Sequence, residues 1–208
     1  RIFGTSGRRP ANGIVARSTA SHHLVVQNVT ISDMDNSGIH FEDTRGGCKV
    51  LHSEIYHCGN GALEDTDALL IWDNSNGNQD WNEIAFNYLH DAQWEDIDVP
   101  TDFIAASGTH LLIHDNTIYN GWSEANISDF ISIRRSKIYV YNNSFLGTSI
   151  GRNQRLFISA WIVPIDDVRI YNNLFYQEDN ATSVSVAISV RCDFGYLLSN
   201  VYVLNNTF

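Results

Sequence analysis

Apolar and polar residues alternate in short runs along the whole chain, and each run ends in asparagine followed by a large apolar residue. The clearest run, KIYVYNNSF at 137–145, recurs as VRIYNNLF at 168–175 and VYVLNNTF at 201–208, with looser copies at 111–118 and 84–89. Alternation with a period of two predicts a short strand, and the asparagines predict a tight turn before the next strand.

The turn asparagines recur at a nearly constant spacing. Aligning the copies places five of them in one column: Asn87, Asn116, Asn143, Asn173 and Asn206. Their spacing of roughly 30 residues predicts stacked structural repeats. Asparagine tolerates the left-handed backbone of a tight turn, and stacked amides hydrogen-bond along in-register parallel arrays. We therefore expect an asparagine ladder in which each turn amide bonds to those above and below it.

A second apolar segment lies between successive asparagine turns and is predicted to form a further strand in each repeat. Its inward column is expected to contain Ile14, Ile39, Leu69, Ile104, Ile131, Ile158 and Ile188. Three strands of about five residues plus turns fill one repeat, and stacked repeats place parallel strands ~4.8 Å apart. Residues 1–208 are thus predicted to form one all-β domain, a parallel solenoid of about seven coils.

The repeats and the asparagine column make the chain resemble the right-handed parallel β-helix proteins of the pectate lyase and polygalacturonase type. The resemblance covers nearly the whole chain and implies a right-handed solenoid that acts on carbohydrate. The NTD, GHG and RIK motifs of polygalacturonases are absent, and DTD at 65–67 is only a faint match to the first of them. The sequence therefore does not indicate a hydrolase of that subfamily.

The charge and the ends of the chain bear on its partners. A net charge of −11 predicts repulsion from nucleic acid and from anionic membranes. The sequence contains no stretch of 18 consecutive apolar residues, so it predicts no membrane-spanning helix. Both ends of the sequence fall within a coil, and an uncapped parallel stack leaves unpaired strand edges. We therefore expect flanking sequence in the natural protein, or end-to-end association with another copy.

The loops predict where a ligand binds. They lengthen on both sides of one strand per repeat, whereas the asparagine turn never lengthens. These strands are 38–42, 68–72, 103–107, 130–134, 157–161 and 187–191. Long loops on both sides should wall a groove along this sheet, and loops on a rigid scaffold commonly carry binding and catalysis.

Four side chains are predicted to face a polysaccharide in this groove: Trp72, Trp161, Arg191 and His40. Aromatic faces stack on sugar rings, and arginine pairs bidentately with carboxylates. The alternative is that these long side chains only cover the surface of the sheet.

A column of aspartates precedes the same strands and contains Asp67, Asp102 and Asp129. On neighbouring coils their Cα atoms should lie ~5 Å apart. Three carboxylates at that distance cannot all be charged unless a cation neutralises them or one of them keeps its proton. Oxygen-only ligands suit Ca²⁺, which is the predicted metal for these three residues. Two other interpretations stay open: paired carboxylates that hydrolyse a glycosidic bond, and aspartates that only bond local backbone amides.

Arg134 belongs to the same coil as Asp129 and lies one coil from Asp102. The resemblance implies β-elimination from a uronate, with an arginine or lysine base on this sheet beside calcium-binding aspartates. Arg134, Asp129 and Asp102 are the predicted catalytic residues of a secreted or cell-surface polysaccharide lyase. The alternatives are a non-catalytic adhesin, surface filament or phage-fibre segment, and a glycoside hydrolase.

Overall fold

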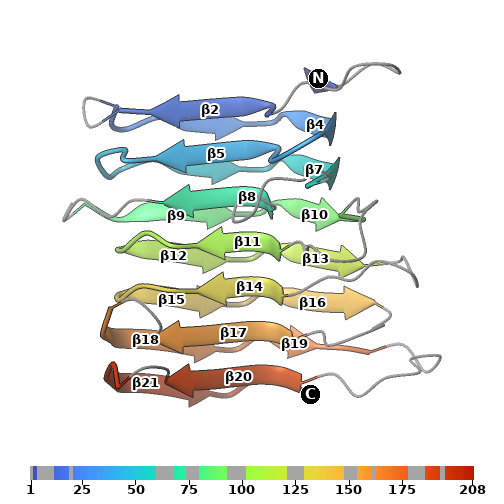
Figure 1. The fold of residues 1–208 in the computed structure, drawn as a ribbon. Helices are drawn as coiled ribbons and strands as arrows, with labels where there is room; N and C mark the ends of the chain where they lie inside the picture. Colours follow the sequence, from blue (N-terminus) through green and yellow to red (C-terminus); the bar gives the residue numbers. More distant parts are fainter. Residues whose placement is uncertain are drawn as a thin grey trace.

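The chain forms a parallel β-solenoid (Figure 1). The computed structural model describes residues 2–3, 12–18, 21–59, 68–73, 80–92, 102–120, 129–147, 154–160, 163–177, 186–192 and 195–208. Within these residues the chain has three parallel sheets of seven strands each and no helix. No membrane-spanning helix therefore occurs in the described part of the chain.

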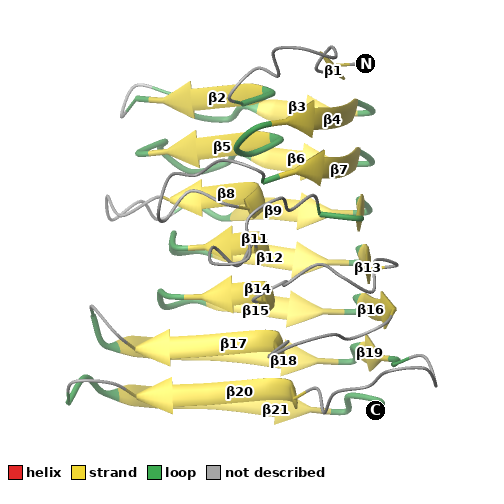
Figure 2. Cartoon of the chain, turned by 45° about the vertical axis from the view of Figure 1, so that its right-hand side comes forward, coloured by secondary structure: helices red, strands yellow, loops and turns green. Residues whose placement is uncertain are grey.

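Each coil contributes one strand to each sheet, and the three sheets form the sides of the stack (Figure 2). Sheet 1 consists of β2 (Ile14–Arg17), β5 (Ile39–Glu42), β8 (Ala68–Asp73), β11 (Asp102–Ala106), β14 (Asp129–Ile133), β17 (Gln154–Ala160) and β20 (Val186–Cys192). Sheet 2 consists of β3 (Val25–Gln27), β6 (Lys49–Leu51), β9 (Asn82–Ala85), β12 (Leu111–His114), β15 (Ile138–Tyr141), β18 (Ile165–Tyr171) and β21 (Leu198–Leu204). Sheet 3 consists of β1 (Ile2–Phe3), β4 (Thr30–Met34), β7 (Glu54–Cys58), β10 (Tyr88–His90), β13 (Thr117–Asn120), β16 (Ser144–Gly147) and β19 (Leu174–Phe175).

The core fills the interior with aliphatic side chains from all three sheets. Ile104 and Ile131 of sheet 1, Val140 of sheet 2 and Ile118 of sheet 3 have no exposed surface. The rings of Phe145 and Phe175 of sheet 3 stack within the same interior. The coils therefore share one continuous hydrophobic core, which is the expected source of stability in a stacked repeat protein.

The register of sheet 1 differs from the predicted column at two strands. Ile104 pairs with Ile131 as expected, but Leu70 rather than Leu69 pairs with Ile104. In β17, Ile158 pairs with Ile133 and Leu156 takes the expected place beside Ile131. The first error arose because residues 69–72 are apolar at every position, so alternation gives no signal there. The second arose because a shift of two residues keeps every side chain on the same face.

The asparagine ladder is confirmed. The side-chain amide of Asn87 donates to Oδ1 of Asn116 (3.0 Å), and Asn116 donates to Asn143 (3.0 Å). The ladder continues from Asn143 to Asn173 (3.1 Å) and from Asn173 to Asn206 (3.0 Å). Asn87, Asn116, Asn143 and Asn173 are buried, so these bonds satisfy amides that water cannot reach.

The left-handed residue of each turn comes directly before the ladder position, not at it as expected. These residues have φ between 48° and 58° and are Asn28, His52, Phe86, Asp115, Asn142, Asn172 and Asn205. Asparagine and aspartate hold four and one of these positions, in keeping with their tolerance of this conformation. The double asparagine of the repeat thus has two roles, one for the backbone and one for the ladder.

Candidate functional site

The candidate site lies on the outer face of sheet 1. One outward-facing row of residues follows directly after the last inward-facing residue of each strand of sheet 1. This row contains Arg17, Glu42, Asp73, Ser107, Arg134, Ser159 and Arg191. The observed register places Asp73 and Ser159 where Trp72 and Trp161 were expected. The row is therefore charged and polar, and its described residues include no aromatic side chain.

Trp72 is a core residue, and its prediction as a substrate-binding residue is wrong. Its side chain has no exposed surface, and its ring lies 4.8 Å from that of Phe41. It pairs with Phe41 and Ala106, both of which point inward. The one-residue difference at β8 is the cause, because it moves every side chain of that strand to the opposite face.

A conservative substitution tests this assignment. Among the described residues Trp72 Nε1 has no hydrogen-bond partner, so Trp72→Phe removes no bond and leaves only a small void. The free energy of unfolding should fall by only about 1 kcal/mol, and binding of polysaccharide should not change. Chemical denaturation and a binding titration of the same variant measure both. Weaker binding of polysaccharide at an unchanged free energy of unfolding would contradict the assignment of Trp72 to the core.

Two other predicted residues, Trp161 and Asp67, lie outside the described residues. The structure therefore places neither the second tryptophan of the predicted groove nor the third carboxylate of the predicted calcium site.

The structure brings the three predicted catalytic residues together. Asp102 and Asp129 are the first residues of the neighbouring strands β11 and β14, and they are 6% and 5% exposed. Nη2 of Arg134 lies 3.9 Å from Oδ2 of Asp102. Nε of Arg134 donates to Oγ of Ser132 (3.1 Å), which holds the guanidinium against the sheet. Ser132 is a contact that the sequence pattern did not single out.

Asp102 holds its proton more tightly than an ordinary aspartate does. Burial raises its pKa well above the ordinary value, the neighbouring charge of Asp129 raises it further, and the guanidinium of Arg134 partly opposes both. A carboxyl group with a raised pKa beside a second carboxyl group is a common arrangement for acid and base chemistry. The pair with Arg134 thus places two carboxyl groups and one positive charge within one site.

The pH dependence of stability tests the state of Asp102. The unfolded pKa of aspartate is about 3.9 and the folded pKa is higher, so the folded state binds the proton more tightly. The contribution of the Asp102 carboxyl group to the free energy of unfolding is fully present below about pH 4. It is lost as the pH rises through the pKa of the folded state. Asp102→Asn should remove this loss and unfold at a higher temperature than the wild type at pH 8.

Thermal unfolding followed by circular dichroism between pH 4 and pH 8 measures the effect. The exposed Asp80 provides the matched control, since Asp80→Asn removes a carboxylate without changing the pair. If the unfolding temperature of Asp102→Asn depends on pH as steeply as that of the wild type, the raised pKa assigned to Asp102 is wrong.

The two remaining substrate-binding predictions lie far from Arg134 along the sheet. His40 is on β5, three strands from β14, and is 7% exposed. Burial lowers its pKa, as does the charge of Arg17, and Nε2 lies 3.8 Å from the carboxylate of Glu42. Arg191 is on β20, two strands beyond β14, and is exposed. Only a ligand that spans several coils would reach both residues and Arg134.

The described residues do not by themselves form a calcium site. No group of three His, Cys, Asp or Glu side chains among them could hold a metal ion. Ca²⁺ takes six to eight oxygen ligands, whereas the described part of the site offers two buried carboxylates. The guanidinium of Arg134 beside Asp102 also opposes a second cation at that carboxylate.

Comparisons with known proteins give a distant likeness. No protein-family model and no curated protein matches the chain. Among solved structures, the crystal structure of an alginate lyase from Paenibacillus sp. str. FPU-7 is similar, at 11% identity and a TM-score of 0.34. The alignment covers 98% of this chain and 86% of the alginate lyase. A similarity this low transfers no activity, since one fold hosts many functions.

Proposed function

We propose that this protein is a secreted or cell-surface polysaccharide lyase. In this proposal an acidic, uronate-containing glycan lies along the outer face of sheet 1 of a right-handed β-helix. The observation that carries the proposal is the arrangement of Asp102, Asp129 and Arg134, in which two buried carboxyl groups adjoin one arginine. β-Elimination needs a positive charge at the uronate carboxylate, a base at C5 and a proton for the leaving oxygen.

Each of the three residues has one role in the proposed reaction. The guanidinium of Arg134 pairs with the uronate carboxylate and acidifies the proton on C5. We assign Arg134 to charge neutralisation because the ordinary pKa of arginine is too high for a base. The carboxylate of Asp129 takes the C5 proton, and the protonated Asp102 gives its proton to the glycosidic oxygen. The C4–O bond breaks as the C4–C5 double bond forms.

The small exposed fraction of both carboxyl groups suits this chemistry. Electrostatic interactions are stronger where water is excluded, so the two carboxyl groups influence each other more strongly than they would in bulk water. Arg134 itself keeps 36% of its side-chain surface exposed and so remains accessible to a ligand in the groove.

A panel of uronate polymers tests the proposal. The wild type should release products whose ultraviolet absorbance reports the new double bond. Each reaction should be run with added Ca²⁺ and with a chelator, because Asp67, Asp102 and Asp129 remain the proposed ligands if calcium is required. Absence of both the absorbance and new reducing ends on every polymer would contradict catalysis and favour a structural or adhesive solenoid.

Glycoside hydrolysis is the second candidate function, and the adjacent carboxyl groups of Asp102 and Asp129 favour it. Adjacent carboxyl groups of which one holds its proton are the usual machinery of glycosidic hydrolysis. New reducing ends without the absorbance of an unsaturated product would select hydrolysis over elimination.

A further inference from the structure

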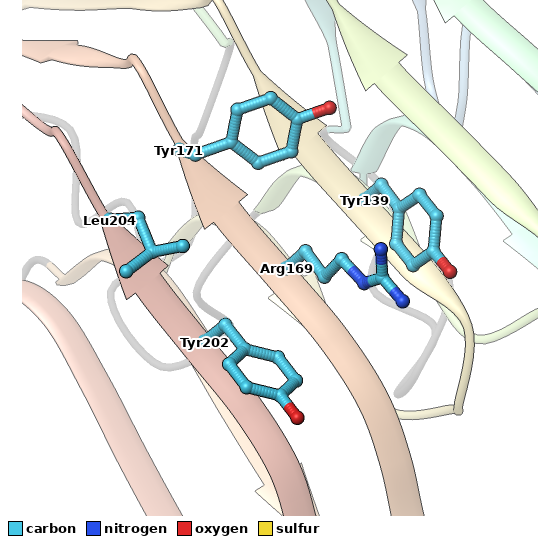
Figure 3. A pocket seen from close by; sticks show the side chains of 5 residues that line it. All are labelled: Tyr139, Arg169, Tyr171, Tyr202 and Leu204. Atoms are coloured by element: carbon cyan, nitrogen blue, oxygen red, sulfur yellow. The ribbon is translucent and has the colours of Figure 1, made fainter.

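A pocket lies on the outer face of sheet 2 (Figure 3). Sheet 1, which carries the candidate active site, is a different sheet of the solenoid. It has a volume of about 530 Å³ and is lined by Tyr139, Arg169, Tyr171, Tyr202 and Leu204. Pockets of roughly 300–1,000 Å³ hold small ligands. The pocket is thus large enough for one or a few sugar units.

The register of three strands builds this pocket around one arginine. Tyr139 of β15 pairs with Arg169 of β18, which pairs with Tyr202 of β21. In the next outward column, Tyr171 of β18 pairs with Leu204 of β21. Arg169 therefore has an aromatic ring on each neighbouring coil and a third beside it on its own strand (Figure 3).

The carboxylate of Asp167 fixes two of these side chains. Nε of Arg169 donates to Oδ1 of Asp167 (2.9 Å), and the hydroxyl of Tyr139 donates to Oδ2 (2.7 Å). The guanidinium carbon lies 4.6 Å from the centre of the Tyr139 ring. Both side chains are thus held before any ligand binds, which lowers the entropic cost of binding.

The remaining donors of Arg169 select an anion. The Asp167 carboxylate engages Nε of Arg169, and among the described residues neither Nη group of Arg169 makes a hydrogen bond. Two parallel N–H groups match a carboxylate bidentately. Lys137, which directly precedes β15, has its Nζ 3.2 Å from a ring nitrogen of His110 and does not line the pocket. Arg169 is therefore the basic group presented inside the aromatic pocket.

The rest of the lining selects a ring with an apolar face. Tyrosine presents a flat apolar surface with a polar edge, which suits the C–H face of a pyranose. Tyr202 and Leu204 are 46% and 55% exposed, so the lining is open to solvent. A ligand that combines such a face with a carboxylate is a uronic acid. Successive coils ~4.8 Å apart repeat the aromatic surface along a glycan chain.

We propose that the outer face of sheet 2 is a second, non-catalytic binding site for uronic-acid oligosaccharides. The site would hold an acidic glycan on a side of the solenoid separate from sheet 1. This site uses only Arg169 and the tyrosines, so binding there does not depend on the cleavage proposed for Arg134.

A calorimetric titration in the Arg134→Gln variant tests this site without turnover of the ligand. The probe is an oligouronate of four sugars, and its carboxyl-reduced neutral counterpart is the matched ligand control. Arg169→Gln added to this background should weaken binding of the oligouronate at least tenfold, and Tyr171→Ala should do the same. The neutral counterpart should bind at least tenfold more weakly than the oligouronate.

Tyr88→Ala is the matched control variant, because Tyr88 is an exposed tyrosine of sheet 3 that stacks on His90. It should leave the affinity unchanged, and thermal unfolding of each variant verifies its fold. Equal affinities of folded Arg169→Gln and its parent would overturn the proposal, as would equal affinities for the acidic and neutral probes. Failure of the wild type to cleave glycans would contradict only the proposed function.

Discussion

Arg134→Gln should lower the rate of cleavage of a uronate polymer by about 10²–10³-fold, the usual cost of removing one group that stabilises developing charge. The guanidinium is the positive charge that neutralises the substrate carboxylate, and glutamine keeps the approximate length of the side chain without that charge. Initial rates at saturating polymer, followed by the absorbance of the unsaturated product, measure the loss. Arg134→Lys should recover part of the rate, because it restores the charge without the bidentate fork.

Arg45→Gln provides the control for a general effect of charge. Arg45 is an exposed loop residue between sheets 1 and 2, so its removal changes the net charge equally without touching the candidate site. Its variant should cleave at the wild-type rate. A wild-type rate in Arg134→Gln would contradict the proposed site, and equal losses in both variants would indicate long-range attraction of the polymer.

Asn116→Ala should lower the free energy of unfolding by about 3 kcal/mol or more. The side-chain amide donates to the carbonyl of Ile84 (2.9 Å) and to Oδ1 of Asn143 (3.0 Å). Its Oδ1 accepts from the backbone and the side-chain amides of Asn87, both at 3.0 Å. Alanine removes all four of these buried bonds, although Asn143 Oδ1 keeps the backbone N–H of residue 116 and Asn87 Nδ2 keeps the carbonyl of Val50. Each buried group left unsatisfied costs about 1–3 kcal/mol. Equilibrium denaturation in urea measures the loss.

Asn206→Ala supplies the comparison within the same ladder. Asn206 accepts from Asn173 and donates to the carbonyl of Ile170 (3.1 Å), but its position is only partly buried. Water can replace the lost bonds there, so the free energy of unfolding should fall by only about 1 kcal/mol. Equal losses at Asn116 and Asn206 would show that burial of the ladder contributes little.

Local pattern was sufficient where one side-chain type has one physical role in every coil. The column of Asn87, Asn116, Asn143, Asn173 and Asn206 was aligned correctly from the sequence, because the same side chain occupies the same turn of each of these coils. The grouping of Asp102, Asp129 and Arg134 was also predictable, since it required only that β11 and β14 be neighbours in register.

The aromatic residues show where that reasoning failed. Trp72 was expected in the groove and lies in the core, whereas the tyrosines of sheet 2 line a pocket that alternation alone did not indicate. A tyrosine pattern shows which face a side chain occupies, but the pocket also depends on Asp167, whose carboxylate holds Tyr139 and Arg169 together across two coils.

The sequence by itself determined the parallel solenoid, the ladder and the neighbouring strands of the candidate site, because hydrophobic period and repeat spacing are local properties of the chain. Only the tertiary structure decided the registers of β8 and β17, the burial of Trp72 and the pocket around Arg169. Register depends on how side chains of adjacent coils pack together, and strands that are apolar throughout, or that can shift by two residues, give no local signal of that packing.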